Sequence, residues 1–164
     1  MNRSASVCIS PVCAGDAAFL CSLMNHPSVL RALNEVPTTQ QGWADAIREW
    51  LSDEDEEDVI IIKDSSPIGW LGVNGLLENG KTVYLKMAAL LPEAQGQGFD
   101  AQAIRALMRG LKLRGFQQMI LYTDQENQQA QACYRKCGFE PVECLTEIMS
   151  NGRTVPRLRM EANL

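Results

Sequence analysis

The sequence has only one histidine, His26, and its six cysteines include no Cys-x-x-Cys pair. Structural zinc sites usually take their ligands from two closely spaced pairs of cysteine or histidine. Cys133 and Cys137 lie four residues apart on a predicted helix and share one of its faces, but no second pair completes a site. We therefore predict no metal site. We interpret the cysteines as reduced thiols that serve as small apolar residues.

Long apolar runs and an excess of basic residues are also absent. No apolar stretch approaches the roughly 18 residues that span a bilayer, and the first residues do not resemble the apolar core of a signal peptide. The net charge of −5 disfavours nucleic acid, whose phosphates require a basic surface. We therefore predict a cytoplasmic protein that binds neither membrane nor nucleic acid. The sequence leaves the oligomeric state open, a homodimer included.

The composition that remains is typical of one globular domain. The chain has 164 residues, of which 46% are hydrophobic and 21% are charged, close to the globular average. It has no linker, repeat or low-complexity tract, so we predict a single domain over residues 1–164.

Periodicity predicts a mixed α/β domain. Short turns, one of them at 78–81 with Asn79-Gly80, join three successive strands and indicate an antiparallel meander. Thr38 and Gln41 have the spacing of a capping box, and Trp43, Ile47 and Leu51 then share a helix face. The predicted strands are 6–12, 58–63, 68–77, 83–91, 118–123, 139–148 and 154–160, and helices are predicted at 16–24, 27–32, after Thr38, 99–113 and 126–136.

The most informative local pattern is a glycine loop at 95–98 (QGQG), between the strand at 83–91 and the helix at 99–113. Glycines at such a junction let the backbone approach a ligand closely with its amide hydrogens exposed. The start of the helix adds about half a positive charge from its dipole. The loop therefore predicts a cradle for a phosphate group.

At first, two classes of phosphate-bearing ligand fit this cradle, and one of them is a dinucleotide. Gly96-x-Gly98-x-x-Ala101 matches a dinucleotide fingerprint, and Asp124 lies at a suitable distance to bind a ribose hydroxyl. However, residues 92–95 separate the loop from its strand, and only about forty residues follow Asp124, too few for a doubly wound sheet. The antiparallel meander also disfavours the dinucleotide interpretation.

A second pattern lies at 127–139, where a helix ends in Gly138 and Phe139 starts a strand. Asn127 lies in the first turn of this helix, and Tyr134 lies two turns later on nearly the same side. An amide and a phenol therefore converge on the end of the neighbouring strand. The alternative is that Asn127 only caps its helix and Tyr134 only packs in the core.

Together the two patterns resemble the signatures of the GNAT acyl-CoA N-acyltransferase superfamily. The loop at 95–98 is similar to Gln/Arg-x-x-Gly-x-Gly/Ala, and 127–139 is similar to Asn-x-x-Ala-x-x-(Leu/Cys)-Tyr-x-Lys-x-Gly-Phe. The segment 67–70 (PIGW) and the two-helix opening resemble the branch with ribosomal-protein N-terminal and polyamine acetyltransferases. The resemblance covers nearly the whole chain. It implies a mostly antiparallel sheet with one splayed strand pair, flanked by helices.

The resemblance also implies a reaction, the transfer of an acetyl group from acetyl-CoA to a primary amine of a small molecule or a peptide N-terminus. The glycine loop would hold the pyrophosphate, the end of strand 83–91 and Asn127 would contact the pantetheine arm, and Tyr134 would protonate the departing thiolate. The residues implied to bind acetyl-CoA are Ala89, Leu90, Gln95, Gly96, Gln97, Gly98, Phe99, Asp100 and Asn127.

Three features depart from the family pattern. Asp100 stands where Gly or Ala is expected, and its carboxylate should repel the pyrophosphate unless the side chain turns over the helix start. Gln97 stands where Lys or Arg is common. Strand 83–91 lacks the Glu that serves many relatives as a base, which leaves His26 or an ordered water. A catalytically weak or inactive CoA-binding domain is therefore the alternative function.

The acceptor amine is the least determined part of this prediction. The acidic run 53–58 predicts a solvated loop, or else a funnel for a cationic substrate. Lys86 would disfavour a charged amine if it faced the pocket, and the segment 24–42 is expected to shape that pocket.

Overall fold

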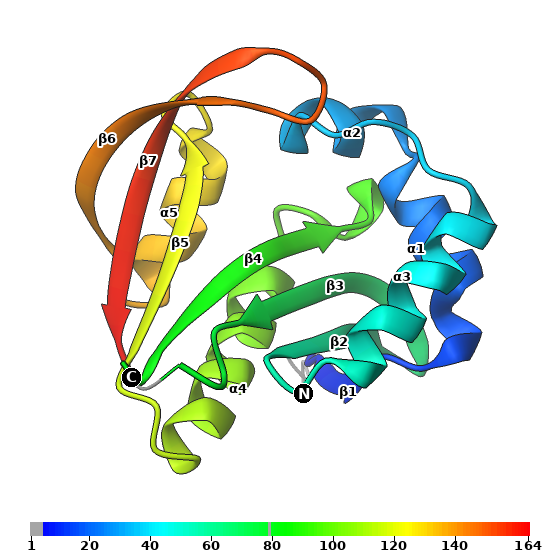
Figure 1. Ribbon diagram of the computed structural model, residues 1–164, viewed down its shortest axis with the longest axis horizontal. Coiled ribbons are helices and arrows are strands. Elements are labelled where there is room, and N and C mark those ends of the chain that lie inside the picture. The colour runs from blue at the N-terminus through cyan, green and yellow to red at the C-terminus, as the bar shows by residue number, and fades with distance from the viewer. Residues whose placement is uncertain (1–4, 79) are drawn as a thin grey trace.

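A seven-stranded sheet in the order β1-β2-β3-β4-β5-β7-β6 forms the centre of the computed structural model, which describes residues 5–78 and 80–164 (Figure 1). Its described strand pairs are antiparallel except for β4 with β5. The strands are β1 (Cys8–Pro11), β2 (Glu56–Lys63), β3 (Ser66–Asn74), β4 (Thr82–Leu90), β5 (Gln118–Asp124), β6 (Glu140–Ile148) and β7 (Thr154–Asn163). The predicted mixed sheet and its antiparallel meander are confirmed. Asn79 of the predicted second turn lies outside the described residues.

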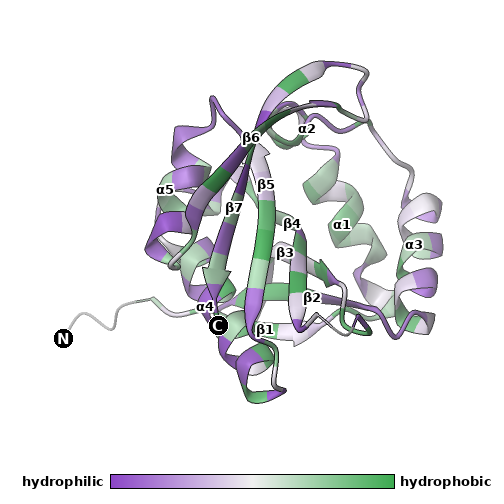
Figure 2. Ribbon diagram, turned by 60° about the vertical axis from the view of Figure 1, so that its left-hand side comes forward, coloured by the Kyte–Doolittle hydropathy of each residue, from purple (hydrophilic) through white to green (hydrophobic). Residues whose placement is uncertain are grey.

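Helices cover both faces of this sheet. On one face lie α1 (Ala17–Met24), α2 (Pro27–Leu33) and α3 (Gln40–Ser52), and on the other lie α4 (Phe99–Leu113) and α5 (Gln128–Lys136). Each face has its own apolar core, centred on Leu20 and Ile47 in one case and on Leu111 and Phe139 in the other. Hydrophobic residues run along the centre of β5, whereas hydrophilic ones mark the outer side of α5 (Figure 2). No helix in the described residues is long and apolar enough to cross a bilayer.

The start and the buried face of α3 differ from the prediction. Thr39, not Thr38, caps this helix, because its hydroxyl accepts the amide hydrogen of Gly42 at 3.0 Å. Leu51 is 59% exposed, and Trp50 packs inward instead, with its ring 5.1 Å from that of Trp70. A helical period of 3.6 residues fits either position, so packing against the sheet decides between them.

The acidic run 53–58 was predicted to be a solvated loop, but only its first half is a loop. Its second half forms the start of β2, and the side chain of Asp58 is completely buried. The indole nitrogen of Trp70 donates to Asp58 at 2.7 Å, and the Lys86 ammonium lies 3.6 Å from the same carboxylate and pairs with Glu56. Burial raises the pKa of Asp58 to about 7, although the Trp70 hydrogen bond opposes this shift.

Candidate active site

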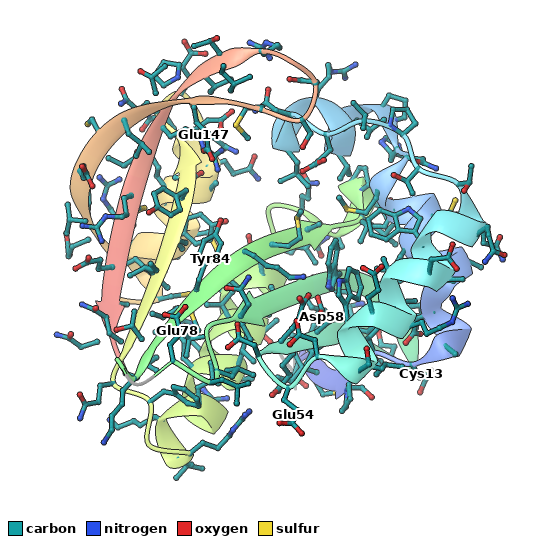
Figure 3. The ribbon with its side chains drawn as sticks, in the orientation of Figure 1. Cys13, Glu54, Asp58, Glu78, Tyr84 and Glu147 are labelled. Atoms are coloured by element: carbon teal, nitrogen blue, oxygen red, sulfur yellow. The ribbon has the colours of Figure 1, made fainter. Side chains whose placement is uncertain are left out.

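The candidate site is a cleft where β4 and β5 separate. The two strands pair in parallel only from Thr82 to Tyr84, opposite Gln118 to Ile120, and diverge beyond Tyr84 (Figure 1). The cleft that opens has a volume of about 410 Å³ and is lined by both strands, by α2 and α5, and by the β6–β7 turn. The ring of Tyr84, a residue of β4, lies 5.7 Å from that of Tyr122 on β5, and Glu147 lies on β6 (Figure 3). The splayed strand pair implied by the family resemblance is confirmed.

A β-bulge in β4 sets the direction of the residues at this cleft. Gly72 pairs with Met87 and Val73 pairs with Leu85, so Lys86 is the extra residue on β4. The ammonium of Lys86 lies 4.6 Å above the ring of Trp50 and is neutralised by the acidic start of β2. Lys86 lines the cleft, but its charge is held at the sheet face beneath α3.

The end of β4 presents backbone to the cleft. Ala89 and Leu90 both line it, and no described residue of β5 pairs with this stretch. The Leu90 carbonyl is already used, because the side-chain amide of Gln95 donates to it at 3.1 Å. Gln95 therefore ties the glycine loop to the strand end, a role that the sequence pattern did not reveal.

The glycine loop has the backbone conformation of an anion cradle. Gly96 and Gly98 have φ values of 74° and 82°, a region that other residues rarely adopt. No atom lies within 4 Å of the place that a Cβ would take at either glycine. Conformation, not lack of space, thus requires glycine here. Gly98 has no side chain that could cap α4, so the amides of Phe99 and Asp100 at the helix start stay available to an anion, whereas the Ala101 amide is bound by Asp100.

The flanking residues of the loop have different roles. Phe99 is buried in the core, so only its backbone belongs to the loop surface, and the Gln97 side chain donates to the Glu93 carbonyl at 3.0 Å. Asp100 lines the cleft, and its Oδ1 accepts the amide hydrogen of Ala101 at 2.8 Å. Asp100 therefore caps the helix start and also places a negative charge on the wall of the predicted pyrophosphate site.

Helix α5 brings Asn127 and Tyr134 to the cleft. Asn127 caps the helix through Oδ1, which accepts the Ala130 amide hydrogen at 3.0 Å, and it also lines the cleft. Tyr134 is half-buried, lines the cleft, and meets Phe139 edge-on at 6.0 Å. Burial raises the pKa of Tyr134, with smaller contributions from Cys133 and Asp100. Its hydroxyl therefore holds a proton at neutral pH and can donate it.

The opposite end of the cleft is closed by a polar network. Asn34, which ends α2 with a φ of 55°, is fully buried and donates to Asp124 at 2.8 Å. The Asn34 backbone carbonyl accepts from Asn151 at 3.2 Å, and its side-chain oxygen accepts from Arg153 at 3.2 Å. These contacts fasten the β6–β7 turn to α2. In Figure 1 the turn arches over α2 at this end.

Charged residues at this end were not predicted as site residues. Arg157 pairs with Asp124 through Nη1 at 2.5 Å and with Glu147 through Nε at 3.1 Å. Glu35, just beyond α2, also lines the cleft. Arg157 lies directly opposite Asp124 on the neighbouring strand, a register that the sequence alone does not reveal. The expectation that residues within 24–42 shape the pocket is borne out by Glu35.

His26, considered as a base from sequence, does not line the cleft. Its Nδ1 accepts the amide hydrogen of Ser28 at 3.2 Å and lies 2.9 Å from the Ser28 hydroxyl. The residue therefore serves as the N-cap of α2.

A cleft between diverging strands, with a glycine loop at one end and a tyrosine on its wall, defines a class of acyl-transferring protein, and comparison with known families agrees. Residues 6–140 match the family model described as an acetyltransferase (GNAT) domain, and the chain belongs to this family. The family predicted from the two sequence patterns is thereby confirmed.

Two solved structures show the same fold. Spermidine N-acetyltransferase from Vibrio cholerae, in complex with CoA and spermine, superposes with a TM-score of 0.86 and 20% identity, over 96% of this chain and 95% of that chain. AAC(6')-Ib, in complex with ribostamycin and coenzyme A, superposes with a TM-score of 0.79 and 20% identity, over 96% of this chain and 93% of that one.

Curated relatives match over shorter segments. Mycothiol acetyltransferase of Saccharomonospora viridis is 48% identical over 52 residues, which are 32% of this chain and 17% of that protein. N-alpha-acetyltransferase 30 of Schizosaccharomyces pombe is 32% identical over 69 residues, 42% of this chain and 46% of that protein. The matches therefore span less than half the length of each relative.

Proposed function

We propose that this protein transfers an acetyl group from acetyl-CoA to a primary amine, by direct attack of the amine on the thioester. The observation that carries the proposal is the cleft between β4 and β5, which joins the glycine loop, Tyr134 and the acidic end near Glu35 in one continuous opening. Family membership supports the same reaction.

The residues at one end of the cleft fit acetyl-CoA. The two left-handed glycines and the first two amides of α4 offer donors to a pyrophosphate. The backbone of Ala89 and Leu90 and the amide of Asn127 border the path of an extended polar arm. When bound, acetyl-CoA supplies the activated acetyl group as a thioester.

Two groups of the chain then promote the reaction. Backbone amides at the end of β4 orient the acyl carbonyl and stabilise negative charge that develops on its oxygen. The Tyr134 hydroxyl, which is protonated at neutral pH, donates its proton to the leaving thiolate. Positioning supplies much of the remaining acceleration.

For the acceptor we propose a cationic amine, either a small molecule or a peptide N-terminus. Near the β6–β7 turn the acidic side chains Glu35, Asp124 and Glu147 face the cations Arg157 and Arg153. Lys86, further along the cleft, is paired with Glu56. This end therefore has an excess of negative charge. The structures of similar fold contain spermine or ribostamycin, which suggests amines for the first panel.

The test follows release of free CoA thiol when the full chain is incubated with acetyl-CoA and a panel of polyamines, aminoglycosides and peptides. We expect amine-dependent release with at least one cationic acceptor, and less at high salt. Calorimetry with CoA runs in parallel. Tight CoA binding without release for any amine would instead support the alternative, a non-catalytic CoA-binding domain, which the Asp100 carboxylate favours.

Two further proposals concern the chain as a whole. The structure has one continuous sheet with a core on each face, which supports a single domain. All six cysteines are free thiols, as expected in a reducing compartment, so we propose a cytoplasmic location. Fractionation of cells that express the tagged protein would test this location.

A further inference from the structure

Two cysteines beside the cleft take no part in the proposed reaction. Cys133 and Cys137 lie one turn apart on α5, each 9% exposed, and each thiol influences the ionisation of the other. The Cys137 Sγ also lies 3.7 Å from the Ala101 carbonyl in the first turn of α4. The pair therefore lies directly beneath the helix start that follows the glycine loop.

The two thiols open toward different surfaces. Cys133 lines the main cleft, near Asp100. Cys137 instead lines a second hollow of about 230 Å³ between α4, the end of α5 and the C-terminal residues, together with three cationic side chains. These cations are Arg105, Arg109 and Lys112. An anionic reagent can therefore collect at Cys137, whereas the carboxylate of Asp100 disfavours it at Cys133.

The surroundings also divide the two thiols chemically. The neighbouring Cys133 thiol, with help from Arg105 and Lys136, lowers the pKa of Cys137. The neighbouring Cys137 sulfur, together with burial and Asp100, raises the pKa of Cys133. Because the thiolate is the reactive form, Cys137 is the nucleophile of the pair.

We propose that Cys137 is a thiol-exchange site for small anionic disulfides, and that Cys133 resolves the product into a Cys133–Cys137 disulfide. The Cys137 thiolate attacks one sulfur of the disulfide, forms a mixed disulfide and expels the other half as a thiolate. Cys133 then loses its proton to solvent and attacks the Cys137 sulfur, which releases the second half as a thiolate. The small disulfide is reduced to two thiols while the protein pair is oxidised.

This oxidation would act on α5, the helix that carries Tyr134. Side chains four residues apart on a helix have Cβ atoms about 5–6 Å apart, whereas a disulfide needs about 3.5–4.5 Å. The last turns of α5 must therefore deform when the bond forms. Tyr134 follows Cys133 directly, so its hydroxyl moves relative to the cleft. The consequence for activity rests on the proposed function, but the thiol chemistry itself does not.

The test uses the full chain with its exposed cysteines Cys8, Cys13 and Cys144 replaced by serine. This protein is treated with oxidised glutathione or with neutral 2-hydroxyethyl disulfide. After free thiols are blocked, trypsin cuts at Arg135 and Lys136, between the two cysteines. We expect the peptide ending at Arg135 to stay joined to the peptide beginning at Cys137 until reduction. Oxidised glutathione should react several-fold faster than the neutral disulfide, and this advantage should shrink at high salt.

Variants separate the two roles. Cys133→Ser should retain a glutathione adduct on Cys137, whereas Cys137→Ser should leave Cys133 unmodified. Arg109→Glu should slow the reaction with glutathione disulfide but not with the neutral reagent. Equal labelling of both single variants, or an unreacted pair in the parent, would overturn the proposal.

A second readout follows acetyl transfer. The oxidised protein should lose activity several-fold and recover it with dithiothreitol, whereas the Cys133→Ser/Cys137→Ser double variant should not respond to the oxidant. Formation of the disulfide without loss of activity would overturn the regulatory consequence. If no amine is acetylated at all, the peptide analysis still tests the exchange site, so the two failures are distinguishable.

Discussion

At the scale of single residues, Tyr134 carries the proposed proton transfer. Tyr134→Phe removes the hydroxyl and keeps the packing against Phe139. We expect kcat to fall about 100-fold with little change in the KM for acetyl-CoA, measured by thiol release. Tyr122→Phe, which removes another phenol of the cleft wall, should cost far less. Equal losses in both variants would argue against a specific acid.

Asp100 places a carboxylate where a phosphate group is expected to bind. Asp100→Asn removes the charge and leaves an oxygen that can still accept from the Ala101 amide. We expect CoA to bind about two- to ten-fold more tightly, as measured by calorimetry. Asp45→Asn, on the exposed side of α3, provides the control. An unchanged Kd would show that Asp100 does not repel the ligand.

Asp58 makes stability depend on pH. Its pKa rises from 3.8 to about 7 in the folded protein. The protonated carboxyl therefore stabilises the folded state fully below pH 4, and this contribution is lost as the pH rises through 7. Asp58→Asn cannot ionise and should gain about 1–4 kcal/mol of unfolding free energy relative to the parent over this range. Urea titrations followed by tryptophan fluorescence would measure it. Parallel pH profiles for both proteins would contradict the raised pKa.

At the scale of elements, α2 and the β6–β7 turn meet through Asn34. Asn34→Gly keeps the left-handed backbone but removes the side-chain contacts to Asp124 and Arg153. We expect the KM for the amine to rise about three- to ten-fold, with a smaller effect on acetyl-CoA, and faster hydrogen exchange in the turn. Asp64→Gly, another left-handed residue at the exposed β2–β3 turn, should leave both parameters unchanged. A rise in the acetyl-CoA KM alone would contradict this assignment.

Elements were the features that the sequence predicted most closely. The helix 99–113 matches α4 at both ends, since its apolar period, the preceding glycines and the following Arg114-Gly115 all agree. The predicted buried face of α3 was wrong at Leu51. The choice between Leu51 and Trp50 depends on the stacking of Trp50 against Trp70, which lies on β3. Local patterns fix an element, but contacts from distant strands decide which side it buries.

At the scale of the whole molecule, two parts of the sheet are joined by only a short parallel stretch. Strands β1–β4 and strands β5, β7 and β6 meet at three residue pairs between β4 and β5. A ligand that bridges the cleft should stabilise this junction. At 100 times its Kd, CoA should add about 2.7 kcal/mol and raise Tm by about 5–10 °C, measured by calorimetry. No concentration-dependent rise in Tm would contradict binding in this cleft.

The sequence by itself determined the family, the mixed sheet, the glycine loop and the helix that carries Asn127 and Tyr134. These features depend on periods and turn residues that lie close together in the chain. Only the tertiary structure decided the burial of Asp58, the use of Gln95 as a tie to Leu90, and the Asn34–Asp124–Arg157 network. Each joins residues from different elements, whose register and packing arise only when the sheet assembles.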